Sequence, residues 1–234
     1  MSSNSDTPRE QKGYASSPCM AAETGLYGSQ PSAPQGAAEV ARWRKSERSR
    51  LRADRLARTV AARQAAGAAL SGHLRQLLRT RFGGAGGHVI SFYWPIKGEP
   101  DLRPLMAELH AEGATIALPI VETKAAPLVF RLWTPETQLV RGDWNIPVPP
   151  PGSPVLSPEI TLAPLVGWAP GGFRLGYGGG YFDRTLAAIS PRPFAIGIGL
   201  DSARLPTIFP QPHDIPLDSI LTEAGERFAK TGSG

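Results

Sequence analysis

Short apolar runs, separated by proline, glycine or charged residues, dominate the chain after residue 87. Their length and their content of Val, Ile, Leu and aromatic residues are typical of buried strands. The predicted strands are 88–94, 115–120, 128–133, 160–168 and 194–200. No clear strand is predicted after residue 200. Residues 101–113 instead carry apolar side chains at helical spacing and end at Gly113, which predicts a helix. Residues 185–189 continue another helix behind a glycine-rich loop.

The chain before residue 87 has a different pattern. Residues 1–38 are rich in Ser, Pro, Gly and Ala and show no apolar period, which indicates a disordered or loosely docked tail. Residues 38–81 are rich in Ala, Arg and Leu without proline, so they read as helical, with Gly67 expected to divide two helices or weaken one. The predicted organisation is an N-terminal tail (1–40), a single α/β domain (41–225) and a C-terminal tail (226–234).

Apolar strands that alternate with helices favour a largely parallel sheet covered on both faces. The predicted fold class is therefore α/β, a three-layer α/β/α fold with a mostly parallel central sheet. This type is shared with sugar-phosphate isomerase and CoA-transferase-like folds. The proline-rich segment 145–158 is expected to cross the surface of this domain.

Composition narrows the class of protein further. With 41% apolar residues among 234, the chain can form an ordinary core, and no apolar run approaches a membrane span of about 20 residues. The single cysteine, Cys19, excludes an internal disulfide, and the absence of zinc-type spacing and of a secretory signal fits the cytoplasm. The formal charge of +5 is uneven, because residues 42–81 contain twelve Lys or Arg against two acids. Such a helical segment favours an anionic partner, either nucleotide phosphate, polyglutamate or nucleic acid, although a solvated helix face is equally compatible.

The run RLGYGGGYFDR, residues 174–184, carries the most chemistry. Its glycines, Gly176, Gly178, Gly179 and Gly180, lie between a buried strand and a helix start. There, backbone N–H groups can cradle an oxyanion, and missing side chains let a phosphate approach the main chain. Arg174 can add a charge-assisted hydrogen bond, and Asp183 at the helix start can hold magnesium. The run is neither a Walker loop nor a dinucleotide fingerprint, and a generic glycine turn is its alternative.

The same run closely resembles the signature of the 5-formyltetrahydrofolate cyclo-ligase family. Further segments are similar to that family over 42–223: YWPIKGEPD (93–101), GDWNIPVPP (142–150), HDIPLDSILTE (213–223) and the basic helix around Arg44 and Arg48. The chain departs from the family pattern at Phe182, where the family has tyrosine, and at residues 167–173, which contain no acid.

The resemblance implies an ATP-dependent enzyme that converts 5-formyltetrahydrofolate to 5,10-methenyltetrahydrofolate. ATP would phosphorylate the formyl oxygen, the second folate nitrogen would close the ring, and ADP and phosphate would be released. The implied partners are ATP, Mg²⁺ and a reduced folate, with or without a polyglutamate tail, and the chain is implied to be a monomer or weak dimer. Neither a membrane nor nucleic acid is expected as a partner.

The resemblance also assigns residues. Those implied to bind ATP are Arg44, Arg48, Arg174, Gly176, Tyr177, Gly178, Gly179, Gly180, Tyr181 and Asp183. Those implied to bind the folate are Ile96, Glu99, Asp101 and Tyr181. Arg174 and Tyr181 are implied as catalytic, and Asp183 and Asp214 as magnesium ligands.

Each assignment has a structural alternative. Arg44 and Arg48, one helical turn apart, also suit a solvated helix face. Asp101 suits a helix cap, and Asp214 a turn before Pro216. The aromatic candidates for stacking on pterin or adenine also suit core packing; they are Tyr177, Tyr181, Trp94 and Trp168. The alternative function is a non-catalytic folate- or nucleic-acid-binding paralogue on the same fold.

Overall fold

The computed structural model describes residues 1, 34 and 36–231, so Cys19 and nearly all of the predicted N-terminal tail lie outside the described residues. The helices are α1 (Ala37–Ala57), α2 (Val60–Phe82), α3 (Arg103–Ala111) and α4 (Tyr181–Ala188). The strands are β1 (Val89–Ser91), β2 (Thr115–Ile120), β3 (Val129–Trp133), β4 (Val140–Arg141), β5 (Pro147–Val148), β6 (Val155–Leu156), β7 (Ile160–Pro164), β8 (Gly167–Ala169), β9 (Phe173–Leu175), β10 (Phe194–Ile198), β11 (Ser219–Thr222) and β12 (Gly225–Ala229).

The central sheet has the strand order β12-β11-β10-β7-β1-β2-β3-β6. Neighbouring strands from β11 to β2 run parallel, and Ile90 of β1 lies opposite both Ile116 of β2 and Ile160 of β7. Strands β3, β6 and β12 pair antiparallel at the two edges. The prediction of an α/β fold with a mostly parallel central sheet is confirmed.

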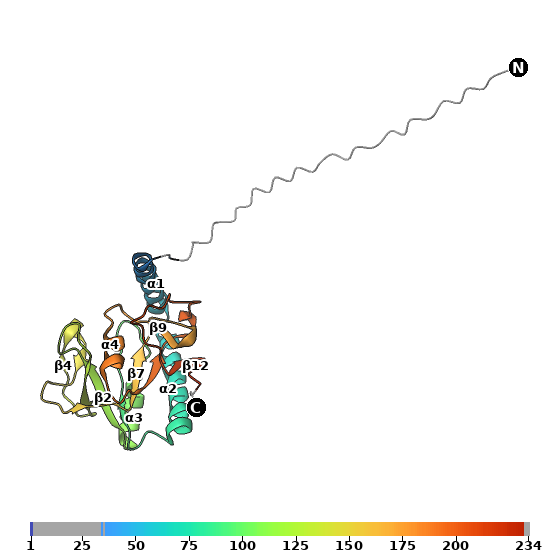
Figure 1. Ribbon diagram of the computed structural model, residues 1–234. Helices are drawn as coiled ribbons and strands as arrows, with labels where there is room; N and C mark the ends of the chain where they lie inside the picture. The colour runs from blue at the N-terminus through green and yellow to red at the C-terminus, as the bar shows by residue number, and fades with distance from the viewer. Residues whose placement is uncertain (2–33, 35, 232–234) are drawn as a thin grey trace. The chain divides into compact units, whose positions relative to one another are not determined.

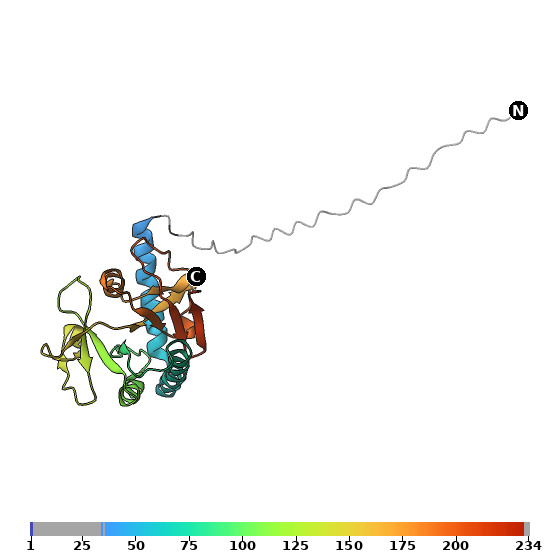
Figure 2. The same ribbon diagram turned by 60° about the horizontal axis from the view of Figure 1, so that its bottom comes forward.

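Helices cover both faces of this sheet. Successive residues of a strand point to opposite sides, so a single strand contacts the helices of both layers. Ile160 and Leu162 of β7 pack with apolar residues of α2 and α3. Ala163 of the same strand faces the other side, where it belongs to a cluster with Leu51 of α1 and Leu186 of α4. Figure 2 shows α2, in teal, and α3, in green, on the near side of the sheet. The alternation of side chains along β7 thus produces the three layers.

The break between the first two helices lies at residues 58–59, and the prediction that Gly67 divides them is wrong. Thr59 caps α2, since its side-chain oxygen accepts a hydrogen bond from the Ala62 amide at 3.1 Å. Gly67 lies inside α2, where a Cβ would come 3.1 Å from the carbonyl oxygen of Asp101. A close approach between α2 and the segment before α3 therefore accounts for this glycine.

The folded elements extend beyond the predicted domain boundaries at both ends. Helix α1 begins at Ala37, inside the stretch 1–40 predicted as a tail, and Val40 is buried. Strand β12 pairs with β11 up to Ala229, so the sheet continues into the stretch 226–234 that the sequence indicated as a tail. No helix among the described residues is long and apolar enough to span a membrane.

The strand order also places the candidate chemistry. From β1 the chain crosses through α3 to β2 on one side, and it returns later to β7 on the other side of β1. The carboxyl ends of β1 and β7 therefore flank a point where the strand order reverses, which is where open α/β sheets bind ligands. Beyond β7, the hairpin of β8 and β9 leads into the glycine-rich loop and α4, as Figure 1 shows.

Candidate functional site

In the glycine-rich loop 176–180, three carbonyl groups accept hydrogen bonds, and the last three amide groups are open. Arg48 donates to the carbonyl of Gly176 at 2.7 Å, and Arg184 donates to that of Gly179 at 2.5 Å. Gly178 and Gly180 have φ of 100° and 64°, which favours glycine at both positions. Among the described residues, no acceptor contacts the amides of Gly178, Gly179 and Gly180. A loop with free N–H groups at the start of α4 can bind an anion.

Helix α1 presents a row of arginines to this loop and its surroundings. Arg44, Arg48, Arg52 and Arg55 are spaced by four, four and three residues, so they share one face of the helix. Arg44 and Arg55 are buried, with exposures of 8% and 4%, which does not fit a solvated face. Burial and the neighbouring charge of Arg44 lower the pKa of Arg48, although Asp214 opposes this effect. The row therefore concentrates positive charge beside the open amides.

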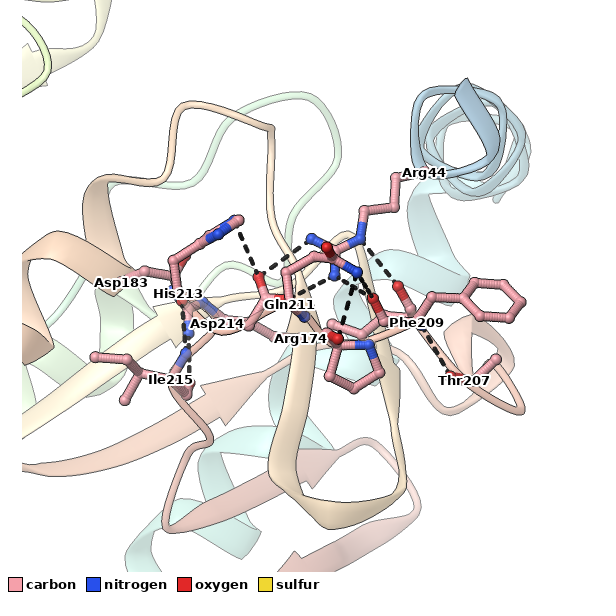
Figure 3. Close-up of polar contacts among 11 residues, drawn as sticks. Arg44, Arg174, Asp183, Thr207, Phe209, Gln211, His213, Asp214 and Ile215 are labelled. Atoms are coloured by element: carbon pink, nitrogen blue, oxygen red, sulfur yellow. Dashed lines mark hydrogen bonds and ion pairs between the residues drawn. The ribbon is translucent and has the colours of Figure 1, made fainter. Parts of the chain in front are cut away.

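Arg44 forms a two-pronged ion pair with Asp214, as Figure 3 shows. Its two terminal nitrogens lie 3.1 and 2.5 Å from the two carboxylate oxygens, and the same side chain donates to the carbonyls of Ile208 and Phe209. Asp214 also accepts from the Gln211 amide at 2.7 Å, so it closes a turn as well. Burial raises the pKa of Asp214, but the hydrogen bonds from Arg44 and Gln211 outweigh it and lower the pKa overall.

A second arginine–aspartate pair lies next to the first (Figure 3). Arg174 contacts Asp183 at 2.9 Å and donates to the carbonyl of Ile215 at 3.2 Å. The Ile215 amide in turn donates to Asp183 at 3.1 Å. Burial lowers the pKa of Arg174, against the opposing effect of Asp183. Arg174 thus joins β9, α4 and the segment after Asp214, and its contacts are with these elements rather than with the glycine loop.

The two aspartates predicted as metal ligands therefore approach one another, each with an arginine. The Ile215 amide and the closest atom of Arg174 both contact Oδ1 of Asp183. Both oxygens of Asp214 are occupied by Arg44. No group of three or more His, Cys, Asp or Glu side chains suitable for a metal occurs within the described part of the chain. One or two carboxylates suffice for a hydrated magnesium bound through phosphates, so Asp183 fits such an ion directly and Asp214 fits once Arg44 releases it.

Glu99 lies buried at the carboxyl end of β1. Its oxygens accept from the hydroxyl of Tyr177 at 2.7 Å and from the Ile96 amide at 2.9 Å. Arg55 donates to the same hydroxyl at 2.5 Å, so Glu99, Tyr177 and Arg55 form a connected chain. Burial raises the pKa of Glu99, although these hydrogen bonds and the charges of Arg55 and Lys97 oppose it. A carboxylate oxygen has a second lone pair, so Glu99 can still accept from a ligand.

Other predicted residues take structural positions. Asp101, one residue before the N-cap position Leu102, accepts from the Arg103 amide at 3.0 Å and pairs with its guanidinium, so it satisfies the first amide of α3. Trp168 is buried and donates to the carbonyl of Leu200, so core packing describes it. Trp94 packs under the guanidinium of Arg103, at 5.1 Å from the ring centre. These contacts support the structural alternatives for all three predicted residues.

Tyr181 has a neighbour that the sequence reading missed. Trp144, in the turn between β4 and β5, lies edge-on to the Tyr181 ring with centroids 5.6 Å apart. It is 67% exposed and has φ of 53°, an uncommon backbone conformation for a bulky residue. The Ala125 amide contacts the Tyr181 hydroxyl at 3.4 Å. An exposed aromatic ring held in a strained turn beside the glycine loop can stack on a flat ligand. In the sequence, the only indication of Trp144 is the family-like segment 142–150 that contains it.

Comparisons with known proteins point to one family. Residues 40–223 match the sequence model of the 5-formyltetrahydrofolate cyclo-ligase family. The 5-formyltetrahydrofolate cyclo-ligase of Mycolicibacterium smegmatis is 30% identical over 144 residues, which are 58% of this chain and 74% of the relative. That of Escherichia coli K12 is 28% identical over 58% of this chain and 78% of the relative. The structure of Aquifex aeolicus 5,10-methenyltetrahydrofolate synthetase superimposes with a TM-score of 0.66 at 24% identity, over 82% of this chain and 95% of that one.

Proposed function

Because the chain belongs to the 5-formyltetrahydrofolate cyclo-ligase family, we propose that it converts 5-formyltetrahydrofolate to 5,10-methenyltetrahydrofolate with cleavage of ATP to ADP and phosphate. The observation that carries the ATP part of this proposal is the glycine loop, whose amides at 178–180 have no acceptor among the described residues. Arg48 and Arg184 fix the carbonyls on the loop, so the amides are preorganised for a phosphate group.

The reaction needs a phosphoryl transfer followed by ring closure. The formyl oxygen attacks the terminal phosphorus of ATP, the bond from that phosphorus to the bridging oxygen breaks, and ADP leaves. The second folate nitrogen then attacks the activated formyl carbon and loses its proton, and phosphate leaves with the former formyl oxygen. The loop amides and Arg48 hold the charge of the transferred group, which is the main catalytic contribution that a protein makes to such transfers.

Arg44 links nucleotide binding to the carboxylates. In the present arrangement its charge is neutralised by Asp214 at 2.5 Å. A polyphosphate bound at the loop competes with Asp214 for the Arg44 side chain. When Arg44 turns to the phosphate, the oxygens of Asp214 become free. Asp183 and Asp214 would then hold Mg²⁺, which supplies charge neutralisation on the phosphates when bound.

Glu99 is the proposed contact for the folate. Its buried carboxylate lies at the end of β1, and the paired N–H donors of an aminopyrimidine suit its free lone pairs. Tyr177 and Arg55 hold the carboxylate in place from one side, and the 96–99 turn holds it from the other. Tyr181 and Trp144 supply aromatic surface on the far side of the loop.

The direct test is the appearance of the methenyl chromophore in the near ultraviolet when purified protein meets 5-formyltetrahydrofolate, ATP and Mg²⁺. Gly178→Ala places a Cβ at a left-handed position beside Arg48, and we expect it to lower kcat/KM by about 100-fold. Gly152→Ala is the matched control, because a Cβ there has open space. Absence of ATP-dependent methenyl formation by the unaltered protein would refute the proposed function, and equal activity of the two variants would refute the role of the loop.

A further inference from the structure

Three cationic side chains surround the ring of Tyr177 in the glycine loop. The guanidinium carbons of Arg52 and Arg55 and the ammonium nitrogen of Lys97 each lie 5.8 Å from its centroid. The carboxylate that contacts the hydroxyl of this tyrosine is Glu99. Nearby acids are engaged elsewhere, since Asp54 pairs with Arg50. This Tyr177 cation cluster therefore carries more positive than negative charge.

The members of the cluster differ in how far their donors are used. Arg55 donates to the Lys97 carbonyl, the Leu165 carbonyl and the Tyr177 hydroxyl, so its donors are satisfied within the fold. Arg52 has a buried Nε with no hydrogen-bond partner, and the structure gives its guanidinium no acceptor among the described residues. A buried donor without an acceptor destabilises the fold, and a charged one does so more strongly, so its retention calls for an explanation.

Lys97 is presented to the same place by a strained turn. Its φ is 50°, a conformation that non-glycine residues adopt uncommonly, and the following Gly98 has φ of 76°. The turn is closed by Glu99, which accepts from the Ile96 amide. Its ammonium group has no carboxylate partner within the described ranges. Backbone strain that directs a cation without an ion pair toward Tyr177 is typical of a ligand-binding position.

The position of Arg52 indicates which anion it meets. Arg48, roughly 6 Å earlier along α1, lies against Gly178 and donates to Gly176, where the proposed phosphate cradle is. At the hydroxyl end of Tyr177 lies Glu99, the proposed folate contact. Arg52 and Lys97 thus lie between the donor phosphate and the pterin end of the acceptor. The group that crosses this interval is the transferred phosphoryl group.

We propose that Arg52 and Lys97 form a subsite that binds the phosphoryl group on its way from ATP to the formyl oxygen and then as the phosphate that leaves. The proposal rests on the proposed function and assigns Arg52 a catalytic role that its sequence position alone does not reveal. Arg52 donates hydrogen bonds to the equatorial oxygens and transfers no proton. The P–O bond to ADP breaks, the P–O bond to the formyl oxygen forms, and the added positive charge stabilises the oxygens throughout.

The kinetic test compares Arg52→Gln with Arg50→Gln, which removes a charge from the outer face of the same helix, where Arg50 pairs with Glu47 and Asp54. Arg52→Gln is expected to lower kcat by about 1,000-fold, within the range known for arginines that stabilise phosphoryl transfer, with KM for ATP nearly unchanged. Arg52→Lys, which keeps the charge, restores part of kcat, and Lys97→Gln lowers kcat less. Arg50→Gln keeps the parent kcat. A rise in KM for polyglutamylated substrate with unchanged kcat would overturn the proposal in favour of a carboxylate subsite.

A binding measurement separates this subsite from the proposed function. Inorganic phosphate should raise the midpoint of thermal unfolding of the parent and of Arg50→Gln, and it should raise that of Arg52→Gln much less. If the parent binds phosphate through Arg52 but forms no methenyl product, the proposed function fails while the anion subsite stands. If phosphate stabilises the parent and Arg52→Gln equally, the subsite is refuted even for an active enzyme.

Discussion

Replacing Asp214 by Asn tests how the structure balances charge at this site. The side chains of Arg44 and Asp214 are each 10% exposed, and their closest atoms lie 2.5 Å apart. Removing one partner of a buried ion pair typically costs about 3–5 kcal/mol, because the other charge stays buried without compensation. Arg44 keeps its hydrogen bonds to two carbonyls, so we expect a loss near the lower limit, about 3 kcal/mol in the free energy of unfolding.

Urea denaturation of the parent and the variant measures this loss. Arg50→Gln is the control, since the side chain of Arg50 is 51% exposed and its ion pairs on the helix surface contribute less than about 1 kcal/mol. In the double variant Arg44→Met, Asp214→Asn, the uncompensated charge is gone, and the loss should be smaller than that of Asp214→Asn alone. If Asp214→Asn costs no more than Arg50→Gln, the pair does not neutralise a buried charge and the reasoning is wrong.

The remaining predictions concern single residues. Glu99→Gln should raise KM for the folate by about tenfold, as expected for loss of a charged hydrogen bond, in steady-state assays. Since burial raises the pKa of Glu99 above its usual 4.5, protonation stabilises the folded parent fully below that value. The free energy of unfolding of the parent, relative to that of Glu99→Gln, should therefore decrease as the pH rises through the folded pKa of Glu99. Urea titrations at several pH values measure this difference. Trp144→Ala should raise KM for the folate and change stability by less than about 0.5 kcal/mol, because the ring is exposed. Gly72→Ala, with open space in α2, should stabilise by about 1 kcal/mol, whereas Gly67→Ala should gain less because its Cβ meets the Asp101 carbonyl.

The central strands could be predicted from the sequence because each is apolar on both faces. Strand β2 coincides with the predicted run 115–120, and β10 lies within 194–200. The sequence pattern does not predict β11 or β12. Strand β11 contains Ser219 and Thr222, which are polar yet fully buried, and the edge strand β12 is largely exposed. Such strands depend on pairing with a neighbour, and pairing partners are not visible in the sequence of the strand itself.

The site was predictable where its residues are close together in the sequence. The glycine loop is one continuous run, so its spacing alone predicts an anion site, with a generic glycine turn as the alternative. Arg44 and Asp214 are separated by 170 residues, and their pairing follows only from the way α1 packs on the domain. Arg52 and Lys97 both lie beside the Tyr177 ring for the same reason, and Trp144 reaches Tyr181 from a separate hairpin. Tertiary packing, rather than local pattern, decides these contacts.

The excess of positive charge around the glycine loop favours the binding of a polyanion. Cationic side chains outnumber carboxylates there, with Arg44, Arg48, Arg52, Arg55, Lys97, Arg174 and Arg184 facing Glu99, Asp183 and Asp214. Burial lowers the pKa of Arg48, and the charge of Arg44 lowers it further, as expected for two neighbouring cations. A bound polyphosphate removes the repulsion between them, so nucleotide binding should stabilise the fold. Because exposed charges are screened within about 10 Å at 0.1 M salt, while buried ones are screened much less, added salt should weaken nucleotide binding while leaving the buried Arg44–Asp214 pair nearly unaffected.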